Sequence, residues 1–234
     1  MKNKQDEIVL LRHDKAVLLL ENRRLRRELE TDELTGLKKT RHFEKLCLAA
    51  LTKHTKKRQS HSSTKHERRE EERYFVVFID LDGLKLTNDT PSSLGGGREV
   101  GNDLLRALAN TLQKRTRKDD VVVRYSEASD EFGVFLTGTS LEEAEKNIKR
   151  ILYHFEENAD VRFPVLSEYF HSRGLKISFS YGTQEIFLDY TEDDIRKVIK
   201  RADELMHKHK ERRKQDRKSM QMACSHSYEE HQFE

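Results

Sequence analysis

Two pairs of acidic residues stand beside apolar segments that are typical of strands. Asp80 and Asp82 follow directly after residues 74–79, YFVVFI. This run is aromatic and β-branched and too short for a helix. Ionised carboxylates at the rim of a core are costly unless something neutralises them, and a divalent cation is the usual partner of oxygen ligands so placed. A plain acidic turn after the strand is the alternative that this segment leaves open.

The second pair, Asp130 and Glu131, lies on the descending arm of a predicted hairpin. Two short β-rich runs, residues 121–123 and 132–136, are separated there by small and polar residues. If the hairpin neighbours the central strand, Asp130 and Glu131 come close to Asp80. Several carboxylates that converge on one rim form the two-metal arrangement that performs phosphoryl transfer.

Helical and strand-like patterns alternate along the rest of the chain. Helices are predicted over residues 40–54, 98–117, 140–158 and from residue 191 onward. Further strands are predicted at residues 175–182 and, as a short edge strand, at 185–188. Residues 53–73 are polar and without hydrophobic periodicity, so we expect a mobile insertion there, and residues 216–234 are expected to be a disordered tail.

Residues 1–31 are expected to form one helix that can be a coiled coil. An a/d seam is formed by Ile8, Leu11, Leu18, Leu25 and Leu29. Lys15 and Asn22 are polar seam positions, which weaken such a helix but can fix its register and oligomeric state. About four heptads can support a parallel homodimer. Leu10, Val17, Leu19 and Leu20 widen the apolar face and favour the alternative, a helix packed on its own domain.

Composition excludes several classes of protein. Of the 234 residues 35% are hydrophobic and 37% charged, and the charge is concentrated at 21–30, 53–73 and 207–218, which leaves enough apolar residues for one core. The formal charge of +3 is too small to indicate nucleic acid. The two cysteines make neither a disulfide framework nor a metal site. No run approaches the ~18 apolar residues of a membrane span and no signal peptide is visible, so we expect a cytoplasmic protein.

Five motifs in order make residues 32–215 resemble the GGDEF family. Residues 32–37, DELTGL, with Arg41-His42-Phe43, are close to the family's opening D-x-L-T-G-L-x-N-R-R-x-F, and residues 79–89, IDLDGLKLTND, match I-D-x-D-x-F-K-x-x-N-D. Residues 97–105, GREVGNDLL, match G-H-x-x-G-D-x-x-L with two changes; residues 117–120 keep R-x-x-D, and residues 202–210 match the closing A-D-x-A-L-Y-x-A-K. The resemblance implies an α/β fold, an α+β sandwich of the nucleotide-cyclase and polymerase-palm type with a central, mostly antiparallel sheet flanked by helices.

The resemblance also implies a function, because the family's members are mostly diguanylate cyclases. They join two GTP molecules, one on each of two facing domains, into cyclic di-GMP. By position, Asp80, the Leu81 carbonyl, Asp130 and Glu131 would hold two Mg²⁺ (or Mn²⁺) ions, with Glu131 and Asp130 in the catalytic roles. The implied substrate-binding residues are Gly83, Leu84, Asn88, Asn102, Lys210 and Lys214. Arg117 and Asp120 would form a product-inhibition site; the alternative for them is an exposed ion pair at a helix end.

Two departures from the family pattern keep a second hypothesis open. Ala128 and Ser129 replace the two signature glycines in a hairpin longer than usual, and side chains there obstruct close approach of the backbone to a nucleotide. Asn102 replaces an Asp that would accept hydrogen bonds from guanine, which can relax or alter base preference. The chain is therefore a working cyclase, favoured by its acidic residues and Lys210, or a degenerate module that binds GTP or cyclic di-GMP and signals through contacts.

Overall fold

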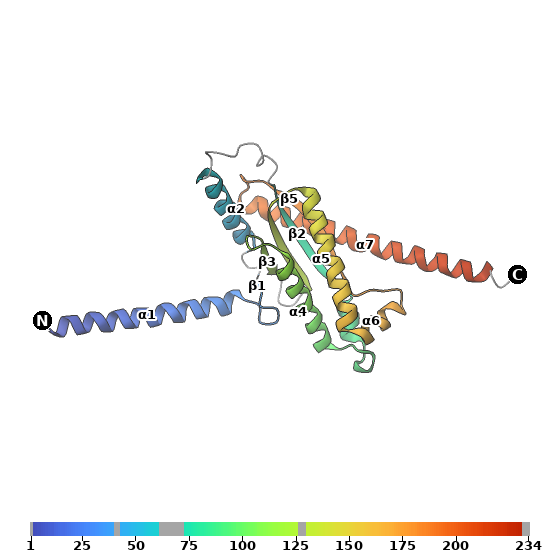
Figure 1. Cartoon of the computed structure of the whole chain (residues 1–234), viewed down its shortest axis with the longest axis horizontal. Coiled ribbons are helices and arrows are strands. Elements are labelled where there is room, and N and C mark those ends of the chain that lie inside the picture. The colour runs from blue at the N-terminus through green and yellow to red at the C-terminus, as the bar shows by residue number, and fades with distance from the viewer. Residues whose placement is uncertain (1, 40–42, 61–72, 126–129, 231–234) are drawn as a thin grey trace.

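The computed structural model describes residues 2–39, 43–60, 73–125 and 130–230, and it arranges them as helices around one five-stranded sheet (Figure 1). The helices are α1 (Lys2–Glu30), α2 (Phe43–Ser60), α3 (Leu84–Asp89), α4 (Arg98–Arg115), α5 (Leu141–Arg162), α6 (Pro164–His171) and α7 (Glu192–Glu230), with a 3-10 turn η2 at Ser92–Leu94. The strands are β1 (Lys38–Lys39), β2 (Arg73–Asp82), β3 (Val121–Arg124), β4 (Glu131–Thr139) and β5 (Ser178–Ile186).

The sheet is mostly antiparallel, as the sequence predicts. Its strand order is β1-β3-β4-β2-β5, with β5 at one edge. Strand β2 pairs with β4 and β5 in antiparallel fashion, β3 pairs with β4 in the same way, and the short β1 runs parallel to β3. The mixed α/β architecture with a central strand at residues 74–82 is therefore confirmed.

Strand β2 separates two hydrophobic cores, because its side chains alternate between the faces of the sheet. Phe75, Val77, Ile79 and Leu81 face a core that α4 and α5 complete, whereas Tyr74, Val76 and Phe78 face a core completed by α2 and α7. The same alternation continues to the end of the strand. It places the Asp80 and Asp82 side chains on the face that α7 covers.

Several elements differ from the predicted ones. Residues 178–186 form one continuous strand instead of two, because each of them pairs with a β2 residue in an unbroken ladder. Helices α3 and α6 were not predicted, since both are too short to show a hydrophobic period. Helix α2 extends into the predicted insertion of residues 53–73, and the rest of that segment, 61–72, lies outside the described residues.

Helix α1 and the C-terminal part of α7 extend away from the sheet in opposite directions (Figure 1). The predicted N-terminal helix is present as α1, and its apolar side chains are exposed, from 47% for Ile8 to 77% for Leu29, so α1 does not pack on its own domain. Helix α7 continues to Glu230, into the segment for which we predict a disordered tail, and residues 216–230 contain no Gly or Pro that would end it. No helix in the described ranges has the length and apolarity needed to cross a membrane.

Candidate functional site

The pairing of β2 with β4 brings the two acidic pairs together. Asp80 lies directly opposite Glu131 in the ladder, and the Leu81 N–H donates to the Asp130 carbonyl at 3.1 Å. The hairpin thus neighbours the central strand in the register that the two motifs require. The residues expected to bind metal and to catalyse meet at one end of the sheet, and their chemical roles remain predictions.

Lys210 of α7 neutralises part of this acidic site. Its Nζ donates to Oδ2 of Asp80, whose side chain is only 10% exposed. Burial raises the pKa of Asp80 to about 6; the Lys210 hydrogen bond opposes this, and the charges of Asp130 and Asp82 add to it. The site therefore carries excess negative charge even with Lys210 in place.

The donor atoms at this site are of the kind that divalent cations prefer. The carboxylates of Asp80 and Asp130 and the carbonyl of Leu81 are hard oxygen donors, and the raised pKa of Asp80, caused first by burial and then by neighbouring carboxylates, favours a positive ligand. Within residues 2–39, 43–60, 73–125 and 130–230, no three His, Cys, Asp or Glu side chains form a metal-binding group. The residues fit a cation in donor type and in charge.

A tight turn follows directly after β2. Gly83 adopts φ 85°, a left-handed conformation that disfavours any other residue, and a Cβ there would contact the Phe170 ring. Leu84 begins the short helix α3. The two residues that are expected to present backbone amides to phosphates therefore lie immediately beyond Asp82.

The two asparagines expected to recognise the base lie on adjacent helices. Asn88 is in α3 and Asn102 is in α4. Gly101, which precedes Asn102, lets the Asn88 side chain approach α4 closely, because a Cβ on Gly101 would collide with Oδ1 of Asn88. The structure thus brings Asn88 against the first turn of α4, next to Asn102.

Lys214, the second predicted phosphate ligand, is not held at the acidic site. It lies one turn beyond Lys210 on α7, is exposed, and donates to Glu211 at 2.6 Å. A lysine on the exposed side of a helix can still reach a long ligand such as a triphosphate.

Arg117 and Asp120 lie apart from the acidic site, between α4 and β3. Asp120 accepts hydrogen bonds from the Arg117 N–H at 2.7 Å and from the Thr137 N–H at 2.9 Å, so its carboxylate holds the loop rather than pairing with the guanidinium. Both residues line a cavity of about 250 Å³ whose other basic residues are Arg115, Lys146 and Arg150. The lining also includes the acidic residue Glu143, and the role of Arg117 and Asp120 as a product site remains a prediction.

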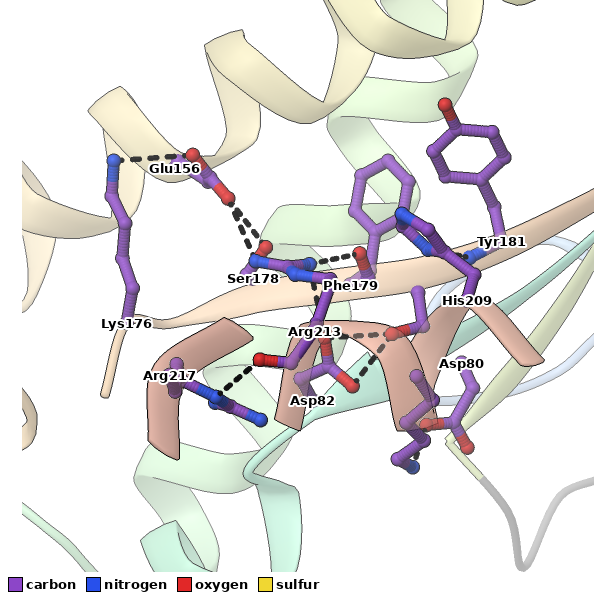
Figure 2. A network of polar contacts seen from close by, with 12 residues as sticks. Asp80, Asp82, Glu156, Lys176, Ser178, Phe179, Tyr181, His209, Arg213 and Arg217 are labelled. Carbon is purple, nitrogen blue, oxygen red and sulfur yellow. Dashed lines mark hydrogen bonds and ion pairs between the residues drawn. The ribbon is translucent and has the colours of Figure 1, made fainter. Parts of the chain in front are cut away.

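A second network, which no sequence pattern predicts, lies beside Asp80 (Figure 2). Both oxygens of Asp82 accept from Ser180 Oγ, at 3.1 and 3.0 Å, and Oδ2 also accepts from Arg213 at 3.1 Å. Arg213 lies 131 residues from Asp82 in the chain, so no local pattern links the two. Asp82 is therefore engaged by protein groups.

Comparison with known proteins identifies the domain that the sequence motifs predict. The family model described as "Diguanylate cyclase, GGDEF domain" matches residues 29–216. The chain is 33% identical over 144 residues to the probable diguanylate cyclase DgcE of Escherichia coli K12, covering 58% of this chain and 11% of DgcE, and 30% identical over 138 residues to diguanylate cyclase DgcZ of the same strain, covering 58% and 40%. It thus spans well under half the length of these relatives.

Solved structures agree in fold. The coiled coil and GGDEF domain of DgcB from Caulobacter crescentus, in complex with c-di-GMP, superposes with a TM-score of 0.61 at 16% identity over 88% of this chain and 94% of that chain. The diguanylate cyclase SiaD of Pseudomonas aeruginosa, in complex with its activator SiaC, gives 0.51 at 20% identity over 90% and 70%. With a family model that covers most of the chain and an acidic site in the expected register, the chain belongs to the GGDEF family of diguanylate cyclase-like proteins.

Proposed function

We propose that this chain is a diguanylate cyclase that condenses two GTP molecules into cyclic di-GMP and releases pyrophosphate. The observation that carries the proposal is the register of β2 and β4, which sets Asp80 opposite Glu131 and beside Asp130, with Lys210 at the same carboxylate. Attack of a ribose 3′-hydroxyl on an α-phosphate requires neutralised charge, alignment and removal of a proton. Acidic and basic groups converge here at one rim.

Each residue has a role that its position allows. Asp80, Asp130 and the Leu81 carbonyl would hold Mg²⁺ or Mn²⁺, which when bound neutralises charge on the reacting phosphates. Glu131, across the ladder from Asp80, is placed to bind a second cation or to accept the proton of the attacking hydroxyl.

Lys210 has two possible partners in this scheme. In the structure its Nζ donates to Asp80 and neutralises that carboxylate. With GTP bound, the Lys210 ammonium would contact the terminal phosphates as a point charge, together with Lys214. Backbone amides of Gly83 and Leu84 complete the phosphate contacts, and Asn88 and Asn102 contact the guanine.

The reaction needs two half-sites, and we propose that α1 joins them. Its a/d seam is exposed and extends away from the domain, so a second copy can pair along it (Figure 1). The related structure of DgcB likewise contains a coiled coil with its GGDEF domain.

We also propose that the basic cavity at Arg117 and Asp120 binds cyclic di-GMP as an inhibitory product.

The proposal is tested by incubating the purified protein with GTP and Mg²⁺ and measuring cyclic di-GMP by mass spectrometry. Product is expected from the wild type and none from Asp130→Ala, while the surface control Asp193→Ala, whose side chain is 77% exposed, retains activity. Absence of product from a demonstrably dimeric wild-type sample would refute the enzyme.

The second candidate is a degenerate GGDEF module, which Ala128 and Ser129 in place of the signature glycines favour. Calorimetry measures binding of GTP and of cyclic di-GMP. The degenerate module is expected to bind either ligand and to form no product in the turnover assay, whereas the cyclase forms product. ATP added alongside GTP reveals a mixed product if Asn102 has altered base choice.

A further inference from the structure

Arg213 connects three elements around the edge of the sheet. Its Nη1 donates to Asp82 Oδ2 at 3.1 Å and to the Phe179 carbonyl at 2.7 Å, and its Nη2 approaches Glu156 Oε1 at 3.4 Å. Asp82 ends β2, Phe179 belongs to the edge strand β5, and Glu156 belongs to α5 on the other face of the sheet (Figure 2). One side chain of α7 thus contacts the central strand, the edge strand and the opposite helical layer.

The acceptors of Arg213 are themselves held in place. Ser180 Oγ donates to both oxygens of Asp82, and Glu156 accepts from Ser178 Oγ and pairs with Lys176 at 3.1 Å. The side chains of Asp82, Glu156 and Arg213 are 12%, 16% and 26% exposed. Charge-assisted hydrogen bonds among partly buried, mutually fixed groups define geometry more sharply than exposed pairs do.

This network lies next to the Lys210–Asp80 ion pair of the proposed active site. Asp80 and Asp82 are two residues apart on one face of β2, and Lys210 and Arg213 are three residues apart on one side of α7. The pairs Lys210–Asp80 and Arg213–Asp82 therefore join the same strand to the same helix. Just before Lys210, His209 accepts the Tyr181 N–H at 3.2 Å, so Lys210 lies between two points at which α7 is fixed to the sheet edge.

We propose that Arg213 is a positioning residue that sets the rotation and height of α7 so that Lys210 meets Asp80. Three of its five N–H donors are engaged by protein acceptors, so its role is to orient the helix rather than to bind substrate. Asp82 in turn serves as the anchor of this contact. The consequence for nucleotide binding rests on the function proposed above, whereas the positioning itself does not.

The positioning is tested without any ligand, by a double-mutant cycle. Asp80→Asn, Lys210→Met and the double variant give the coupling energy of the pair from urea unfolding in metal-free buffer at a pH of about 8, where carboxylates are ionised. The cycle is repeated with Arg213→Met. We expect the coupling to fall to about half or less of its value, because Lys210 is no longer held opposite Asp80. An unchanged coupling would overturn the proposal, however much Arg213→Met lowers overall stability.

Further variants distinguish positioning from general stabilisation. Arg212→Met alters an exposed arginine on the same turn and should leave the coupling unchanged. Arg213→Lys keeps the charge but not the fork of donors, so an intermediate coupling is expected. If Arg213→Met fails to fold, Asp82→Asn removes the same contact from the strand side and should give the same loss; retention of full coupling there contradicts the proposal.

A nucleotide measurement adds the functional consequence. With Ca²⁺ in place of Mg²⁺, to limit turnover, Arg213→Met is expected to weaken GTP binding about tenfold in the presence of Lys210 and to add no further loss in Lys210→Met. Independent, additive losses would show that Arg213 does not act through Lys210. A wild type that binds no GTP refutes the proposed function instead, and the unfolding cycle still decides the positioning.

Discussion

Arg124 donates to both carboxylate oxygens of Asp32, at 3.0 and 3.1 Å, although 92 residues separate them in the chain. Both side chains are only 5% exposed. The pair links the loop before β1 to the end of β3, the strand that leads into the signature loop. Burial acts to raise the pKa of Asp32, but hydrogen bonds from Thr35 and Arg124 outweigh it and lower the pKa.

Breaking this buried pair is expected to be costly. Arg124→Met leaves the Asp32 carboxylate buried without its cation and should lower the free energy of unfolding by about 3–5 kcal/mol. Adding Asp32→Asn should recover part of that loss, because the unpaired charge is then gone. Urea unfolding measures both. Arg106→Met, which breaks an exposed pair with Asp103, is the control and should cost less than about 1 kcal/mol.

Asp80 should make the metal-free protein less stable as the pH rises. Its pKa, raised by burial to about 6, lies above the unfolded value of 3.8, so between these values the folded state holds a proton that the unfolded chain releases. Stability therefore falls as the pH rises through this window, and the full cost is present above it. Asp80→Asn should flatten the stability profile between about pH 4 and 7, measured by thermal unfolding in EDTA.

The slope of that profile is the informative quantity, since Asp80→Asn also deprives Lys210 of its carboxylate. Asp193→Asn on the surface is the control. A profile that stays as steep in Asp80→Asn as in the wild type would mean that another group sets the pH dependence.

Asn102→Asp tests base recognition. An aspartate offers two acceptor oxygens to the N–H groups of guanine, whereas an asparagine also presents donors. We expect the change to strengthen the preference for GTP over ATP about tenfold or more, measured as competing incorporation or as the ratio of dissociation constants. Asn110→Asp, on an exposed position of the same helix, should leave the ratio unchanged. A ratio unaffected by Asn102→Asp would place base recognition elsewhere.

Arg117→Ala tests the basic cavity as a product site. Loss of the guanidinium should weaken cyclic di-GMP binding about tenfold or more and relieve inhibition by added product. Calorimetry detects the first effect even if the protein has no turnover. Arg162→Ala, at the far end of α5, serves as the control. Equal affinity of Arg117→Ala and the wild type would leave the cavity without this role.

A pair of variants on α1 tests the proposed dimer. Leu18→Glu places a charge on the a/d seam and should convert a dimer to monomer in analytical ultracentrifugation. Leu20→Glu alters a residue that is similarly exposed, 64% against 69% for Leu18, but lies off the seam, so it should leave the dimer intact. Dissociation by Leu20→Glu alone would show that the copies pair through the other face of the helix.

The sequence was informative where a signal is local or periodic. The apolar run before Asp80 identified the central strand, and the hairpin pattern before Glu131 identified its neighbour, so their juxtaposition was predictable from two motifs. The helix α1 was also readable, because its hydrophobic spacing lies within one segment, but its exposure was not, since the wide apolar face left packing on the domain open.

Contacts between distant residues were not predictable in this way. In the sequence Arg213 is one more basic residue in a charged helix. The positioning role that we propose for it depends on the pairing of β5 with β2, which sets Ser178 opposite Asp82 and Ser180 opposite Asp80. The buried Arg124 likewise ends β3, a strand whose depth in the sheet is known only once β1 and β4 are placed on either side. Short helices such as α3 carry too few residues for a hydrophobic period.

Strand β5 packs closely against α7 at Gly182, a residue without a functional side chain. A methyl group there would overlap the backbone of the helix at Ala202 and Met206, one turn before Lys210. Even alanine at Gly182 would therefore displace the turn of α7 that carries Lys210 from the Asp80 carboxylate. Substitution of Gly182 is therefore expected to weaken the contact between Lys210 and Asp80 although neither residue is changed.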